Sequence, residues 1–182
     1  MARGRPSKKL QILDSARELF VELGYQGTTI DLVVQNAAVS KPTVYGHFPS
    51  KQVLWQAMLE QTIEAAEQQR NAIEVLSGDW LGAVIEAYRL LAAKPETVAV
   101  YRIMLGERHK MAGEARRLFD DFEYRLTVWC DAVLQAQGAT LDEEQRFVLH
   151  ALCREGMLQP ALRQRPGPDV GRLKQTIARA IE

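Results

Sequence analysis

The sequence of 182 residues has only two cysteines, no long apolar run and no net charge. Cys130 and Cys153 each lie inside a helical pattern, so we predict reduced thiols rather than a disulfide framework. No stretch of about 18 apolar residues is present, so we predict no membrane span. The first residues are basic but no apolar segment follows them, so we predict no signal peptide. These absences favour a soluble, cytoplasmic protein.

Motifs of catalysis and metal binding are also missing. The sequence has no HExxH pair, no glycine-rich phosphate loop and no nucleophile motif, so we do not expect an enzyme. His150 and Cys153 are three residues apart and could share a metal ion, but no third or fourth ligand is evident. We therefore predict neither a metal site nor a cofactor.

The charges balance overall but are unevenly distributed along the chain. Residues 1–55 contain seven Lys and Arg residues against four Asp and Glu residues. Four of the seven lie in the first nine residues: Arg3, Arg5, Lys8 and Lys9. A basic arm beside a compact module is typical of phosphate binding. We expect the two arginines to enter a minor groove of DNA and the two lysines to contact phosphates; the alternative is a solubilising tail.

Helical periodicity extends over almost the whole sequence, and strand patterns are nearly absent. We predict an all-α protein of about nine helices, with an N-terminal arm and three-helix domain in residues 1–52. A larger helical domain follows in residues 53–182. A capping box at Thr140–Glu143 is expected to begin the penultimate helix, and Pro160 is expected to kink or end it.

Residues 29–48 have the pattern of a helix-turn-helix. Thr28 or Thr29 can cap a short helix, and after a turn of about four residues Ser40 can cap a second one. Pro42 suits the first turn of that second helix, where no amide donor is needed. The apolar residues expected to anchor the two helices are Val33, Ala37, Val39, Val44 and Phe48.

The polar residues of the second helix remain available for DNA. They are Ser40, Lys41, Thr43, Tyr45 and His47. Hydroxyl groups can bind phosphate oxygens, and Lys41 or Thr43 can reach base edges in the major groove. Lys51 follows a helix cap and is expected to bind a phosphate. Two alternatives stay open: Tyr45 could belong to the core, and the helix pair could be an ordinary hairpin of a bundle.

Residues 9–55 resemble the N-terminal part of the TetR (tetracycline-repressor) family of bacterial transcription regulators. The matching residues are Ala16, Leu19, Phe20, Gly24, Tyr25, Thr28, Thr29, Val39, Ser40, Thr43, Val44, Tyr45, His47, Phe48, Pro49, Ser50 and Lys51. The resemblance implies a dimer formed by the last two helices, a ligand cavity in the larger domain and release from DNA on ligand binding. It also implies DNA contacts at Thr29, Ser40, Lys41, Thr43, Tyr45, His47 and Lys51.

The turn of the helix-turn-helix departs from the family pattern at Ala38, where the family often has glycine. A left-handed backbone would cost an alanine about 1 kcal/mol, so we expect a turn of slightly different shape.

The larger domain offers candidates for a ligand site and for a dimer interface. Aromatic and methionine side chains that could line an apolar pocket are Trp80, Tyr88, Tyr101, Met104, Tyr124 and Trp129. Residues predicted to face a second copy are Phe147, Ala151, Met157, Leu158, Leu173 and Ile177. The stripe formed by the last two could instead pack only on its own domain.

Together these features predict a homodimeric repressor that a small apolar or aromatic ligand releases from a palindromic DNA operator. A ligand-independent DNA-binding protein of the same fold is one alternative. An all-helical enzyme with an incidental hairpin is the other.

Overall fold

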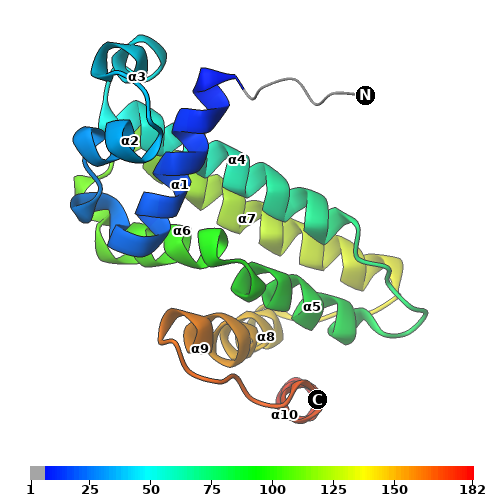
Figure 1. The fold of residues 1–182 in the computed structure, drawn as a ribbon. Helices are drawn as coiled ribbons and strands as arrows, with labels where there is room; N and C mark the ends of the chain where they lie inside the picture. Colours follow the sequence, from blue (N-terminus) through cyan, green and yellow to red (C-terminus); the bar gives the residue numbers. More distant parts are fainter. Residues whose placement is uncertain (1–6) are drawn as a thin grey trace, which may run out of the picture. The chain divides into compact units, whose positions relative to one another are not determined.

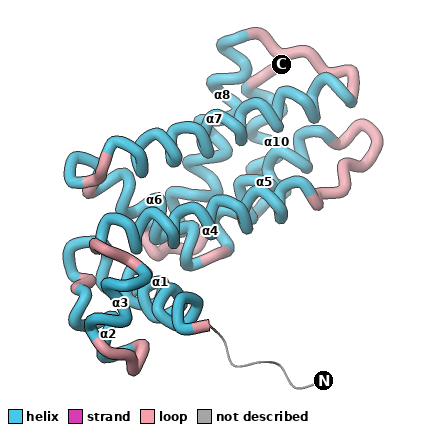
Figure 2. Tube along the Cα trace, turned by 90° about the horizontal axis from the view of Figure 1, so that it is seen from above, coloured by secondary structure: helices cyan, strands magenta, loops and turns pink. Residues whose placement is uncertain are grey.

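The structure is a computed structural model that describes residues 7–182 (Figure 1). The predicted DNA contacts Arg3 and Arg5 lie outside the described residues. Residues 7–182 contain helices and loops but no strand (Figure 2), which confirms the all-α prediction.

The helices follow one another in the order that the periodicity predicts. The first are α1 (Lys8–Gly27), α2 (Ile30–Asn36), α3 (Lys41–His47) and α4 (Lys51–Asn71). Next come α5 (Trp80–Ala93), α6 (Pro95–Gly106), the short 3-10 turn η1 (Arg108–Lys110) and α7 (Gly113–Ala136). The last are α8 (Glu143–Cys153), the π-helical segment η2 (Arg154–Leu158), α9 (Gln159–Leu162) and α10 (Val170–Ala180). The segments α8, η2 and α9 follow one another without a gap and count as one helix. Counted in this way, the described residues contain nine helices besides η1, as predicted.

Side chains cap the N-terminal ends of α2 and α3. The Thr29 hydroxyl accepts a hydrogen bond from the Leu32 amide, and the Ser40 hydroxyl accepts one from the Thr43 amide. Such bonds satisfy amides that have no partner within the helix. The local sequence therefore defines where α2 and α3 begin.

The capping box of α8 is not the predicted one. Asp142 Oδ1 accepts from the Gln145 amide at 2.8 Å, and Gln145 Oε1 accepts from the Asp142 amide at 2.9 Å. The predicted box at Thr140–Glu143 is wrong because aspartate is at least as good an N-cap as threonine, and the frame two residues later offers the same reciprocal pair.

Pro160 does not end its helix where it stands. The helix widens into η2, where the Gln159 amide donates to the Arg154 carbonyl, and it then continues to Leu162. A proline lacks the amide that the α-helical pattern requires, and a π-helical turn is one way to change the register of the bonds around it.

The chain groups into two compact units. The first unit combines the described residues up to Ile63 with Ala99–Phe119, and the second combines Glu64–Val98 with Asp120–Glu182. The predicted boundary at residues 52 and 53 is a division along the sequence and stays a prediction. The first unit holds the helix-turn-helix, and it includes the end of α6, which comes much later in the chain.

In the second unit, α10 packs its apolar stripe against α8 and η2. Leu173 and Ile177 are 7% and 0% exposed, and Met157 and Leu158 are also buried. Gly156 makes this close packing possible, because a Cβ atom there would lie 2.5 Å from Leu173 Cδ2. These four residues, which we predicted to face a partner, are covered within their own unit in the single chain, and the dimer interface stays a prediction.

Candidate DNA-binding site

The helix-turn-helix is anchored by the buried side of α3. Val44 and Phe48 are buried, and so are Val33 of α2 and Ala37 at its end. Val39 of the turn is half-buried. The predicted anchors therefore lie on the inner side, which leaves the opposite side of α3 facing solvent.

The exposed side of α3 carries the predicted DNA contacts. Lys41, Tyr45 and His47 are exposed, as is Ser40 at the cap, while Thr43 is half-buried. Tyr45 is 44% exposed, so it does not belong to the core. The Ser40 and Thr43 hydroxyl groups lie 2.7 Å apart and hydrogen-bond to each other. The two hydroxyl groups therefore fix each other's orientation.

Lys41 is paired with Asp31 of α2. Its Nζ lies 2.8 Å from Asp31 Oδ1, and both side chains are exposed. The hydrogen bond to Asp31, and then its negative charge, raise the pKa of the Lys41 ammonium group. Asp31 is not among the residues that the sequence predicted for this site. Its position in the first turn of a helix, where acidic residues are favoured for local reasons, hid its relation to Lys41.

The turn between α2 and α3 keeps the left-handed conformation despite the alanine. Ala38 has φ 48°, and the Val39 amide donates to the Val34 carbonyl at 3.3 Å. This bond closes the end of α2 in the manner of a Schellman motif, which usually has glycine at the left-handed position. The expected change in the shape of the turn is thus wrong, and the alanine bears backbone strain instead.

Lys51 is held inside the first unit. Its Nζ donates to the carbonyl oxygens of Tyr25 at 2.9 Å and Thr28 at 3.1 Å, and it lies 4.3 Å from the centre of the Tyr25 ring. Burial lowers the pKa of this ammonium group. Two of its three N–H donors are therefore used within the protein, which leaves one for the predicted phosphate contact.

The other predicted contacts lie at the starts of helices. Lys8 and Lys9 are exposed in the first turn of α1, and Thr29 is exposed at the start of α2. Their side chains are accessible for phosphate contacts.

The six residues predicted for the ligand site are divided between the two units. Tyr101 and Met104 are buried in the first unit, where the Tyr101 ring lies edge-on to Phe119. Tyr88 is buried in the second unit and Trp80 and Trp129 are half-buried there, whereas Tyr124 is 67% exposed. Tyr124 therefore points toward solvent rather than into an enclosed pocket.

Two surface grooves of the second unit involve other residues. One of about 340 Å³ is lined by Asp131, Leu134, Gln135, Gly138, Ala139, Thr140 and Arg146. A smaller one of about 120 Å³ is lined by Asp142, Glu144, Gln145, Val148, Ala180, Ile181 and Glu182. Neither groove contains any of the six side chains predicted for the ligand.

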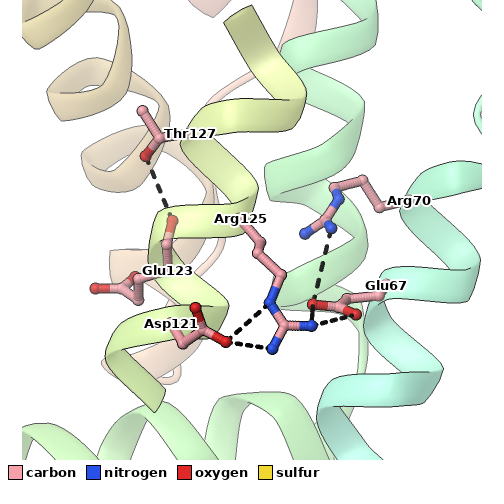
Figure 3. A network of polar contacts seen from close by, with 6 residues as sticks. All are labelled: Glu67, Arg70, Asp121, Glu123, Arg125 and Thr127. Carbon is pink, nitrogen blue, oxygen red and sulfur yellow. Dashed lines mark hydrogen bonds and ion pairs between the residues drawn. The ribbon is translucent and has the colours of Figure 1, made fainter. Parts of the chain in front are cut away.

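A polar network joins α4 to α7 in the second unit (Figure 3). Arg125 contacts Glu67 at 3.2 Å and also pairs with Asp121 one turn away on α7. Arg70, which is 6% exposed, lies 4.0 Å from the same Glu67 carboxylate. A buried arginine is costly without an acidic partner, so removing the Glu67 carboxylate should destabilise the second unit.

Residues 7–182 contain no group of three or more His, Cys, Asp or Glu side chains placed to hold a metal ion. None of the helices described is long and apolar enough to cross a membrane.

Comparisons with known proteins agree with the geometry of the first unit. Residues 12–58 match the model of the family described as bacterial regulatory proteins, tetR family. Over 60 residues the chain is 38% identical to the HTH-type transcriptional activator FasR of Mycolicibacterium smegmatis, a match that covers 33% of this chain and 27% of FasR. The chain therefore matches less than a third of that relative's length.

Solved structures match almost the whole chain. One is a putative transcriptional regulator from Saccharomonospora viridis in complex with choline, with a TM-score of 0.72, 21% identity and coverage of 95% of this chain and 94% of that one. Another is AibR in complex with isovaleryl coenzyme A and operator DNA, with a TM-score of 0.63, 17% identity and coverage of 96% and 95%. Residues 12–58 therefore match the tetR family of bacterial regulatory proteins, and almost the whole chain shares the fold of these solved structures.

Proposed function

We propose that this protein is a homodimeric transcription regulator that binds a palindromic DNA operator and is released from it by a small-molecule ligand. The observation that carries the proposal is the exposed polar side of α3, which presents Lys41, Tyr45 and His47 to solvent. Val44 and Phe48 are buried on the opposite side of the helix. A helix presented in this way suits the major groove. The AibR structure, which contains operator DNA, supports the same use of the fold.

The first test is selection of duplexes from a random pool by the full-length protein. We expect a palindromic winner, because a two-fold dimer reads two half-sites. Tyr45→Phe should then weaken binding of that duplex while leaving thermal stability unchanged, since it removes only an exposed hydroxyl. Failure to retain any duplex would contradict the proposal and revive the enzyme alternative.

The proposed ligand and its effect on DNA binding are supported by the similar solved structures rather than by a cavity in this protein. The Saccharomonospora viridis protein holds choline and AibR holds isovaleryl coenzyme A. A screen for compounds that release the selected duplex tests this part, and we expect a small apolar or aromatic compound to do so. If the selected duplex binds but no compound releases it, the ligand-independent alternative is favoured. A regulator of this kind acts on chromosomal DNA, so we expect it in the cytoplasm.

For the dimer we propose the exposed side of α8. Phe147 is 74% exposed and Ala151 is exposed one turn later. An aromatic side chain with so large an exposed fraction is typical of a surface that a partner covers in the assembly.

Charging this surface tests the dimer. Phe147→Glu should give monomers in sedimentation velocity and a loss of operator affinity, whereas Leu76→Glu, at a residue 64% exposed in a loop, should remain dimeric. The buried Ile177 is unsuitable for this test, because a charge there would destabilise the fold itself. A Phe147→Glu protein that stays dimeric would contradict this interface.

A further inference from the structure

The helix that leads into the helix-turn-helix is broken at one residue. Gly24 within α1 has φ 73° and ψ −175°, a conformation that is essentially restricted to glycine. In an uninterrupted α-helix the Tyr25 amide would donate to the Val21 carbonyl four residues earlier. The break separates these two groups and leaves both available for other partners; for the Tyr25 amide, which is part-buried, an unpaired state would be costly.

Both groups find their partner on the same later segment. The Tyr25 amide donates to Glu107 Oε1 at 3.3 Å, and the Val21 carbonyl accepts a hydrogen bond from the Arg102 guanidinium group. Arg102 lies on α6 and Glu107 directly follows it. Figure 1 shows α6 beside α1. Two side chains of opposite charge thus replace the two halves of one helical hydrogen bond.

The residues just beyond the break are fixed by contacts within the first unit. The Tyr25 ring packs against Phe20 and Trp55, with ring centres 6.0 Å away in each case. The Thr28 hydroxyl donates to the Gly24 carbonyl at 2.8 Å, and Thr29 then caps α2. The angle at Gly24 therefore determines the direction in which the chain enters α2 and, after it, α3.

We infer that Arg102 and Glu107 are positioning residues for DNA binding: by occupying the two backbone groups that Gly24 separates, they hold α2 and α3 in the orientation that binds a duplex. This inference rests on the proposed function. It adds two residues far outside the stretch 12–58 that matches the family model, and neither of them needs to touch DNA.

The test compares full-length variants on the duplex that the wild-type protein selects from a random pool. Glu107→Ala and Arg102→Met should each weaken binding about tenfold or more, as expected for loss of a charged hydrogen bond. Glu107→Gln should stay within about threefold of wild type, because its amide oxygen still accepts from Tyr25. The matched controls Glu114→Ala and Arg116→Met change exposed residues of the same unit and should have no effect.

Two further readouts separate positioning from direct contact and from general destabilisation. The slope of log affinity against log salt should stay as in wild type, because no phosphate contact is lost. Hydrogen exchange should accelerate in residues 22–30 and not throughout the chain. If Glu107→Ala does not fold, Glu107→Asp replaces it, since the shorter side chain keeps the charge but loses the reach to Tyr25.

The inference is overturned if the variants bind like their controls, if the glutamine variant is as weak as the alanine variant, or if the salt slope falls. A wild-type protein that selects no duplex contradicts the proposed function instead, so the two failures are distinguishable.

Discussion

The ammonium nitrogen of Lys41, the first residue of α3, lies 2.8 Å from a carboxylate oxygen of Asp31 near the start of α2. The pair spans the turn of the helix-turn-helix on its exposed side. The carboxylate thus neutralises a cation that would otherwise be free to approach a phosphate, and it restricts where the Lys41 side chain can point.

Asp31→Asn should therefore increase affinity for DNA of random sequence. Removing the negative charge frees Lys41 and ends the repulsion between Asp31 and phosphates, so log affinity should fall more steeply with log salt, by about one unit of slope. Fluorescence anisotropy with a random duplex over a salt series measures this change. Asp14→Asn is the control, because Asp14 is exposed on α1 and pairs with Arg17 instead. An unchanged slope in Asp31→Asn would show that Lys41 already contacts phosphate in the wild-type protein.

Ala38→Gly should stabilise the protein. Ala38 has φ 48°, and relieving an alanine of a left-handed conformation contributes about 1 kcal/mol to the free energy of unfolding. Urea denaturation of the full chain measures the gain. For comparison, the opposite change at Gly24 in α1, Gly24→Ala, should lower the free energy of unfolding by about 1–3 kcal/mol, because that backbone conformation is nearly exclusive to glycine. Loss of stability in Ala38→Gly would mean that the alanine methyl group contributes packing that outweighs the strain.

Stability should depend on pH through His150. The Tyr88 hydroxyl lies 2.8 Å from His150 Nδ1, and burial, followed by the positive charge of Arg154, lowers the pKa of the imidazole. The folded protein therefore binds this proton less readily than the unfolded chain, whose histidine titrates near its ordinary pKa of about 6.5. The contribution to stability is complete above that pH and is lost as the pH falls toward the lowered pKa of the folded state.

Comparison with His150→Gln isolates this group. The difference in the free energy of unfolding between wild type and variant should shift against the wild type below pH about 6.5, by at most about 1.4 kcal/mol per pH unit. Thermal or urea denaturation at several pH values provides the measurement. A difference that is constant across this range would show that His150 has the same pKa in both states.

Gly156→Ala should destabilise the second unit. The added Cβ atom would lie 2.5 Å from Leu173 Cδ2, and overpacking of this kind typically costs about 1–3 kcal/mol. Leu173→Val in the same chain should recover part of the loss, because the two positions are in contact. Gly46→Ala is the control, since nothing lies within 4 Å of its added Cβ atom. Equal stability of Gly156→Ala and wild type would show that α10 can move away from η2 without cost.

Local sequence patterns were sufficient to predict most of the helices and which side of α3 is exposed. Thr29, Ser40 and Asp169 cap helices because their side chains reach amides three residues ahead, a relation within a single turn of chain. The division of α3 into buried Val44 and exposed Tyr45 likewise results from helical periodicity. Such properties depend on neighbours in the sequence, so the sequence alone determined them.

Only the tertiary structure decided which partners those residues meet. Lys51 bonds to the carbonyl groups of Tyr25 and Thr28, and Leu173 packs over Gly156 within its own unit, because residues distant in sequence come together there. The relation of Arg102 and Glu107 to the bend at Gly24 has the same origin. Glycine at position 24 allows the backbone conformation that breaks the helical hydrogen bond, but the side chains that satisfy its two halves are determined by packing.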